Sequence, residues 1–266
     1  MNKKELLDRC ARDGEERVLL ARALDRLELS QNRGVPAHTP FLSPGEQAAV
    51  RDLMNSCGKP RHLFWGGYPE SERNICFFPA DWQELDAPPG GLDGPLAALE
   101  AKFPAGAAPT HRDILGSLMG LGLTREVLGD ILLPQPGLCQ VAALREAVPI
   151  LLSQWEGAGR WKARFTEIPL ERLVPTPVQV KTIRDTVAAP RLDAVLAAGF
   201  SLSRSKAAAL IASGKAAINH RECLKGDRQV AEGDVITCRG LGKCVVKEVS
   251  GLSKKGRTIM VIERYI

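Results

Sequence analysis

The sequence predicts an α+β protein made of three small modules, and three observations support this prediction. The chain has 266 residues, of which 44% are hydrophobic and 25% are charged, a composition typical of folded proteins with two or three domains. Helix-like and strand-like hydrophobic patterns alternate along it. Two proline- and glycine-rich stretches, 86–95 and 169–179, separate these patterns. We therefore expect modules at residues 1–85, 96–168 and 181–266.

The first module is predicted to be a small α/β unit. Apolar residues recur every three or four positions over residues 2–28, which predicts one helix. A second helix is expected over 43–55, because Ser43-Pro44-Gly45-Glu46 combines an N-cap, a proline at the first helical position and a capping-box glutamate. Short strand-like runs follow at 61–65 and 74–78.

The second module is predicted to have the order β-α-β-β-α-β. Strand-like runs occupy 96–103, 127–132, 138–144 and 162–168, with one helix starting after Thr110 and another over 145–155. Ferredoxin-like domains and a common RNA-binding fold share this order. The aromatic signature with which such sheets stack bases is missing, so a structural or protein-binding role is the alternative.

Basic residues are concentrated in the third module. From residue 181 onward there are 16 Lys and Arg against 8 Asp and Glu, a net charge of +8, so the whole-chain charge of +5 leaves −3 for residues 1–180. Such asymmetry indicates an anionic partner. The basic residues do not follow one long amphipathic helix with an aromatic face, which favours nucleic acid over a membrane surface.

Two short helices open the basic module. The first is expected over 191–200 with Gly199 as its C-cap, and the second is expected to be capped by Ser203 and ended by Gly214. Arg204 and Lys206 fall in the first turn of the second helix, where cations oppose the helix dipole and a bound phosphate would reverse that cost. The alternative is that both are ordinary solvated surface cations.

Short strands are expected at 215–219, 228–237, 245–249 and 258–262. The whole stretch closely resembles the S4 RNA-binding domain through R-L-D-x-x-L at 191–196, S-R-S-x-A-x-x-L-I-x-x-G from Ser203, and V-x-x-G-D before Val235. Asp193 is expected to pair locally with an arginine. The resemblance implies that one surface contacts the backbone of structured RNA through Arg191, Ser203, Arg204, Ser205, Lys206, Lys215, Asn219 and Arg221.

Nothing in the sequence specifies catalysis, a cofactor or a metal site. Four dispersed histidines and seven scattered cysteines without a C-x-x-C pair match no zinc motif or disulfide framework. His111-Arg112-Asp113 is similar to the start of a protein-kinase catalytic loop, but the other kinase motifs are absent. The combination of Thr110 with Asp113 predicts a helix cap instead. No run is long and apolar enough for a membrane span. We expect a cytoplasmic, monomeric protein without a small-molecule substrate.

The upstream region resembles the YlmH family of bacterial S4 proteins. The resemblance lies in R-H-L-F-W-G-G-Y at 61–68 with Glu72-Arg73, and in H-R-D-I-L-G-S-L-M-G-L-G at 111–122. It implies a non-enzymatic factor that contacts ribosomal RNA and tRNA on stalled large ribosomal subunits, in ribosome-associated quality control. Secondary RNA contacts are expected at Arg61, Arg73, His111 and Arg112.

Two other functions stay open. S4 domains also accompany pseudouridine synthases, so an RNA-modifying enzyme with unrecognised catalytic residues is one alternative; the upstream region lacks a second G-R-L-D motif with its threonines. The other is a scaffold, because the family also has an association with cell division.

Overall fold

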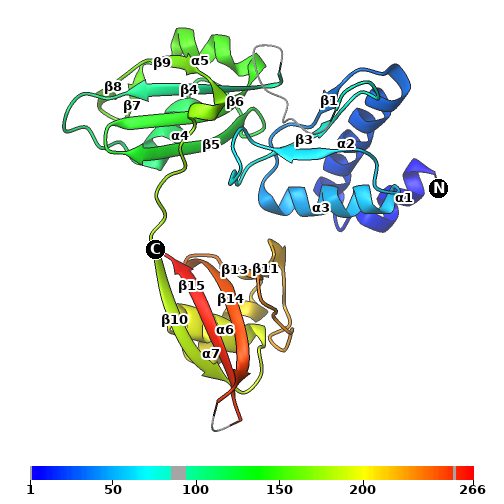
Figure 1. Cartoon of the computed structure of the whole chain (residues 1–266), viewed down its shortest axis with the longest axis vertical. Coiled ribbons are helices and arrows are strands. Elements are labelled where there is room, and N and C mark those ends of the chain that lie inside the picture. The colour runs from blue at the N-terminus through cyan, green and yellow to red at the C-terminus, as the bar shows by residue number, and fades with distance from the viewer. Residues whose placement is uncertain (1, 85–93, 254–255) are drawn as a thin grey trace. The chain divides into compact units, whose positions relative to one another are not determined.

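The computed structural model describes residues 2–84, 94–253 and 256–266. The chain divides into two compact units, Met1–Pro177 and Val178–Ile266, whose elements are labelled in Figure 1. The first unit contains both the N-terminal and the central modules. Most of the predicted linker at 86–95 lies outside the described residues.

The N-terminal module packs three helices against a small antiparallel sheet in the order β1-β3-β2. The single helix predicted over 2–28 is wrong: Asp13 accepts a hydrogen bond from the Glu16 amide at 2.8 Å and starts a new helix. The capping box predicted at Ser43 is present. The elements are α1 (Lys3–Cys10), α2 (Gly14–Arg33), β1 (Ala37–His38), α3 (Pro44–Ser56), β2 (Leu63–Trp65) and β3 (Ile75–Phe78).

The central module has the predicted β-α-β-β-α-β order, with the four antiparallel strands arranged β5-β6-β4-β9. A small hairpin of β7 and β8, which the sequence did not predict, precedes the last strand. The elements are β4 (Leu96–Lys102), α4 (His111–Met119), β5 (Leu128–Gln135), β6 (Leu138–Leu144), a 3-10 turn (Arg145–Ala147), α5 (Val148–Gln154), β7 (Gly157–Ala158), β8 (Trp161–Lys162) and β9 (Phe165–Ile168).

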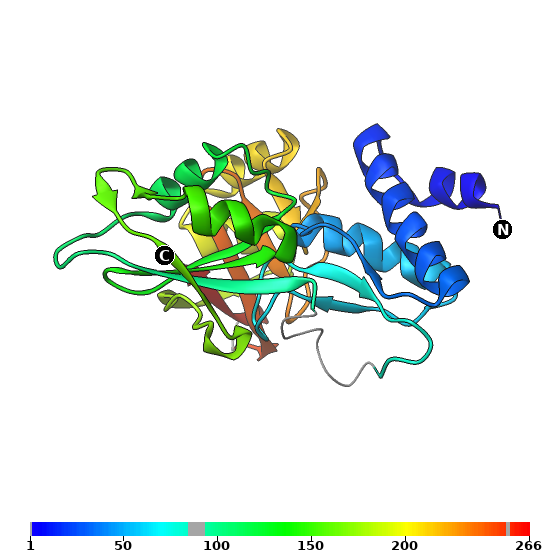
Figure 2. The same cartoon turned by 90° about the horizontal axis from the view of Figure 1, so that it is seen from above.

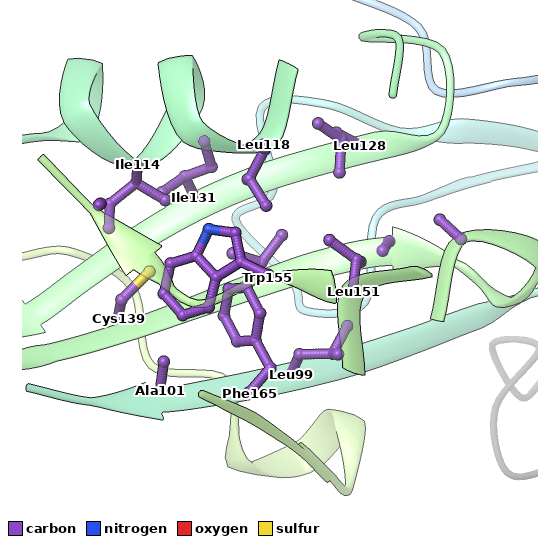
Figure 3. Packing of buried hydrophobic residues seen from close by; sticks show 14 of the residues in the cluster. Leu99, Ala101, Ile114, Leu118, Leu128, Ile131, Cys139, Leu151, Trp155 and Phe165 are labelled. Carbon is purple, nitrogen blue, oxygen red and sulfur yellow. The ribbon is translucent and has the colours of Figure 1, made fainter. Parts of the chain in front are cut away.

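Residues of α4 and α5 pack on one face of this sheet, and Trp155, at the end of α5, lies among the buried side chains of that core (Figure 3). Its indole stacks on Phe165 with ring centroids 4.0 Å apart. The indole Nε1 donates a hydrogen bond to Ser117 Oγ at 2.8 Å, so this buried polar atom is satisfied. An aromatic pair with a satisfied polar atom fixes both helices on the sheet.

The opposite face of the same sheet is also covered by protein. Phe41, Tyr68 and Phe77 of the N-terminal module pack against apolar residues of β4, β5 and β6. Gly129 makes this approach possible, because a Cβ there would lie 2.7 Å from the Phe41 ring. The two modules therefore share a core, which explains why they form one unit.

The segment predicted as a stiff linker at 169–179 is in large part packed onto that face. Leu170 and Leu173 are buried, around a 3-10 turn at Leu170–Arg172. The Gln140 amide donates to the Arg172 carbonyl at 3.0 Å and accepts from the Val174 amide at 2.9 Å. The linker prediction is therefore wrong up to Thr176, whose hydroxyl accepts from the Leu133 amide at 2.8 Å.

Polar groups also join the two modules. The Asp130 carboxylate on β5 accepts hydrogen bonds from the Tyr68 hydroxyl and the Glu72 amide, both at 2.7 Å, and from the Arg73 amide at 3.1 Å. Burial, with this hydrogen bond to Asp130, raises the pKa of Tyr68. One carboxylate thus holds the loop that follows the Gly66-Gly67 turn.

The C-terminal unit places two helices beside a six-stranded antiparallel sheet in the order β10-β15-β14-β13-β11-β12 (Figures 1 and 2). The strand at 180–187 was not predicted, and the predicted strand at 228–237 forms only at its end. The elements are β10 (Val180–Val187), α6 (Leu192–Phe200), α7 (Arg204–Ala212), β11 (Ala216–Ile218), β12 (Arg221–Glu222), β13 (Val235–Cys238), β14 (Gly242–Leu252) and β15 (Thr258–Tyr265).

The turn between α6 and α7 corrects the predicted role of Gly199. Ser201, with a φ of 54°, is the left-handed C-cap of α6, whereas Gly199 lies inside the helix. A Cβ at Gly199 would lie 3.1 Å from Cys244 Sγ and 3.5 Å from Ile262 Cγ2. The glycine therefore allows α6 to approach β14 and β15 closely.

Candidate nucleic-acid interface

The first turn of α7 presents cations where the helix dipole is positive. Ser203 is the N-cap, as predicted, and its hydroxyl accepts from the Lys206 amide at 3.3 Å. The Ser205 hydroxyl lies 3.1 Å from the Ser203 hydroxyl. Arg204 and Lys206 are exposed, and this turn contains no acidic residue. The arrangement favours a bound anion, which would satisfy both the cations and the helix end.

Asp193 holds two of the predicted arginines in place. Its Oδ2 accepts from Arg204 Nη2 at 2.6 Å and lies 3.4 Å from Arg191 Nη2. The Asp193 side chain is 13% exposed, whereas Arg204 is 53% and Arg191 41% exposed. The predicted local pairing of Asp193 is confirmed, and it leaves most of the Arg204 side chain accessible at the junction of the two helices.

Two further cations reach the start of α6. The Asp193 amide donates to the Gly226 carbonyl at 3.0 Å, and the Leu192 amide donates to the Arg228 carbonyl at 2.8 Å. These bonds lay the segment with the exposed Lys225 and Arg228 along the first turn of α6. The sequence showed these residues only as part of a basic module, because the backbone pairing that positions them joins residues more than 30 positions apart.

Lys215 lies at the other end of α7, where β11 begins. It is exposed and follows Gly214, which has a φ of +70°. The Arg239 amide donates to the Lys215 carbonyl at 2.8 Å, so the exposed Arg239 is its neighbour. Arg221 lies on β12, paired in register with Ile218 of β11.

Asn219 is bonded within the domain. With His220 it forms a two-residue turn in which both residues have positive φ, 48° and 65°. Its Nδ2 donates to Asp234 Oδ1 at 2.7 Å, and its Oδ1 accepts from the Val235 amide at 2.9 Å. The side chain therefore ties the β11–β12 turn to the start of β13.

Of the four residues predicted to make secondary RNA contacts, Arg61 and Arg73 are bonded to backbone carbonyls of the protein itself. The Arg73 guanidinium donates to the carbonyls of Phe41, Arg125 and Leu128 at 3.1, 2.8 and 3.0 Å, and burial with nearby Arg125 lowers its pKa. The Arg61 guanidinium donates to two carbonyls of the loop at 81–83.

His111 and Arg112 open α4, where the predicted Thr110–Asp113 capping box is present. Burial, with Arg125, lowers the pKa of His111. Arg112 is exposed, and no hydrogen bond or ion pair engages its side chain within the described residues. Arg112 is therefore accessible to a partner from solvent.

In residues 2–84, 94–253 and 256–266 no group of three or more His, Cys, Asp or Glu side chains is arranged to hold a metal ion. All seven cysteines are free. No single described helix is long and apolar enough to cross a membrane, and α6 with α7 meets that test only as a pair bent by 116°.

The fold and the cationic helix junction of the C-terminal unit define an S4-domain protein. The S4 domain model matches residues 190–236. Two further models match upstream, "YlmH, N-terminal" at 15–77 and "Putative RNA-binding domain in YlmH" at 96–172. The chain belongs to the YlmH family of S4-domain proteins.

Two relatives extend this comparison. The chain is 29% identical to "Ribosome-associated protein quality control protein P2" of Bacillus subtilis over 251 residues, which are 94% of this chain and 95% of the relative. A solved structure, "Cell division protein ylmH from Streptococcus pneumoniae", matches with a TM-score of 0.51 at 18% identity, over 62% of this chain and 98% of the other. This second likeness supports the fold alone.

Proposed function

We propose that this protein is a non-enzymatic factor that binds ribosomal RNA and tRNA on the large ribosomal subunit and acts in the rescue of stalled ribosomes. The observation that carries the RNA-binding part is the Asp193-centred junction, which places Arg191, Arg204 and Lys206 together at two helix starts. The ribosomal part rests on the name of the Bacillus subtilis relative.

The chemistry of the junction suits phosphate groups of folded RNA. Arginine donates paired hydrogen bonds to phosphate oxygens, and serine hydroxyls and helix-terminal amides add further donors. Each phosphate that is neutralised releases counterions, so the affinity should fall steeply with salt. Selectivity should come from the shape of the RNA, because double-stranded RNA exposes backbone and 2′-hydroxyl groups more readily than bases.

The direct test measures binding of the full-length protein to purified large ribosomal subunits over a range of salt concentrations. Arg204→Glu with Lys206→Glu should lower the affinity at least about tenfold and reduce the salt slope by about two phosphate contacts. Lys181→Glu with Arg184→Glu changes the net charge equally on β10, away from the helix starts, and should have a much smaller effect. Unchanged binding of the first variant would remove the helix junction from the mechanism.

The cellular context is tested by sedimenting a lysate that contains tagged protein through a sucrose gradient. Enrichment on large subunits that carry tRNA supports the stalled-ribosome proposal. Absence from every ribosomal fraction at physiological salt contradicts it. A modified nucleotide in RNA incubated with the protein would instead identify an enzyme, and a protein partner retained after nuclease treatment would identify a scaffold.

A further inference from the structure

The central module needs a binding surface other than the open face of its sheet. Domains with this strand order commonly bind RNA on the sheet face opposite the helices. Here that face is covered by two segments of the protein. One contributes Phe41, Tyr68 and Phe77 of the N-terminal module, and the other contributes Leu170 and Leu173. Any RNA contact made by this module must therefore use its helices, loops or the added β7–β8 hairpin.

The β7–β8 hairpin is a rigid element. Gly157 pairs with Lys162 and Ala158 with Trp161. Gly157 has a φ of +135°, and a Cβ there would lie 2.1 Å from the Trp161 carbonyl oxygen, so only glycine fits. Ala158 is buried, and Trp161 packs against the core around Trp155. The hairpin is thus anchored through one side and has a defined conformation.

The other side of the hairpin is strongly basic. Arg160, Lys162 and Arg164 are all exposed, Arg164 with 71% of its side chain. The Arg160 guanidinium lies over the Trp161 ring, 4.6 Å from its centroid, which holds it in place. Glu156 is an acidic neighbour, with its Oε1 3.8 Å from Arg164 Nη2. Lys162 and Arg164 border a shallow hollow of about 250 Å³.

The tip of the hairpin lies beside the start of α4. A Cβ at Gly159 would lie 3.8 Å from Asp113 Cγ, in the first turn of that helix. This contact adds the exposed Arg112, one residue earlier, to the same region. The region beside Asp113 thus has exposed cations from α4 (Arg112), from the hairpin (Arg160 and Lys162) and from the segment that follows it (Arg164), in a unit whose overall charge is slightly negative.

We propose that Arg112, Arg160, Lys162 and Arg164 form a second RNA-binding surface, which contacts the phosphate backbone of a folded RNA helix. This inference rests on the proposed function, since it adds a contact to the RNA that the S4 domain binds. A lipid surface is disfavoured, because Trp161 packs inward and the hairpin offers no exposed apolar side chain for insertion. Trp161 is for the same reason an anchor for Arg160 and not a platform for base stacking.

The test uses full-length protein and purified large ribosomal subunits. Arg160→Glu with Lys162→Glu should weaken binding at least about fivefold and lower the salt slope, because two phosphate contacts become repulsive. Arg160→Lys with Lys162→Arg should keep most of the affinity. Arg26→Glu with Arg33→Glu, at exposed positions on α2, makes the same charge change and should bind nearly as well as the wild type.

Four outcomes separate this inference from the proposed function. If the hairpin variant binds like the α2 control while Arg204→Glu with Lys206→Glu does not bind, the hairpin surface is wrong and the S4 proposal stands. If the wild type does not bind, both fail. Loss of binding in the hairpin variant, together with a urea unfolding curve that matches the wild type, supports the inference. Hairpin-dependent binding to phosphatidylglycerol vesicles, with subunit binding unchanged, would assign the surface to membranes and overturn the inference.

Discussion

Arg204 at the start of α7 donates a hydrogen bond of 2.6 Å to Asp193 in the first turn of α6. The two residues are 11 positions apart and belong to helices separated by the turn at Ser201. The acidic partner lowers the repulsion between Arg204 and Arg191, which share its Oδ2 atom. A single carboxylate thus lets two cations occupy one small surface in the absence of RNA.

Asp193→Ala should destabilise the C-terminal unit by about 1–2 kcal/mol, because a largely buried, charge-assisted hydrogen bond is lost and two arginines are left close together. Hydrogen exchange of the α6 amides should report this loss as faster exchange. Asp227→Ala removes the same charge from an exposed turn nearby and should change the exchange rates little. Equal protection in the two variants would show that Asp193 has no structural role.

Arg73→Ala should destabilise the first unit by about 2–3 kcal/mol, because three backbone carbonyls at the junction of the modules lose their donor. Trp65, Trp82, Trp155 and Trp161 are the four tryptophans of the chain, and all lie in this unit. Their fluorescence during urea unfolding therefore measures the effect selectively. Arg61→Ala, which removes bonds to a surface loop, is the control and should cost less than about 1 kcal/mol.

Tyr68→Phe should reduce the stability of the first unit at neutral pH and also change its alkaline dependence. Burial and Asp130 raise the pKa of Tyr68 above the value of about 10 expected in the unfolded chain. The folded state therefore holds this proton more tightly, so the stabilisation is complete below pH 10 and is lost as the pH rises further.

The measurement for Tyr68 compares tryptophan-detected unfolding of wild type and variant from pH 8 upward. The stability difference between them should shrink above about pH 10. Tyr265→Phe, at the other tyrosine of the chain and in the C-terminal unit, should leave the tryptophan-detected curve unchanged at every pH. If the stability difference between wild type and Tyr68→Phe stays constant with pH, the raised pKa of Tyr68 does not contribute to stability as expected.

Asn219 and Lys215 should respond differently to alanine, although both were predicted to contact RNA. Asn219→Ala removes the bonds to Asp234 and Val235 and places a less tolerant residue at a φ of 48°. It should cost about 1–3 kcal/mol, seen as faster hydrogen exchange in β11 and β13. Lys215→Ala should leave exchange unchanged and weaken binding to large subunits. If Lys215→Ala speeds exchange and Asn219→Ala only weakens binding, Lys215 is the structural residue and Asn219 is the RNA contact.

Sequence patterns predicted the central module well, because its strands and helices are defined by local periodicity and by the Thr110 capping box. They failed where partners are distant. Residues 180–187 are mostly exposed, and they form a strand through pairing with β15 at the end of the chain. The break between α1 and α2 was missed because the apolar residues before and after it both have helical spacing, although no apolar residue lies between Ala11 and Val18.

The candidate site was predicted unevenly for the same reason. The motif from Ser203 predicted the cap and the first-turn cations correctly, and the motif at 191–196 predicted the pairing of Asp193, because these features depend on residues close in sequence. Arg73 was predicted to contact RNA, yet its carbonyl partners lie 32 to 55 positions away. Lys225 and Arg228 were not predicted as contacts, since only the folded chain brings them beside α6.

The connection between the two units is very short. Thr176 is hydrogen-bonded in the first unit, and the Gln179 carbonyl already accepts from the Ile266 amide in the second, which leaves Pro177 and Val178 between them. When one unit has bound an RNA, the two-residue connection keeps the other unit tethered close to that RNA. Its effective local concentration then becomes high, and two individually weak contacts can act as one strong, slowly dissociating attachment.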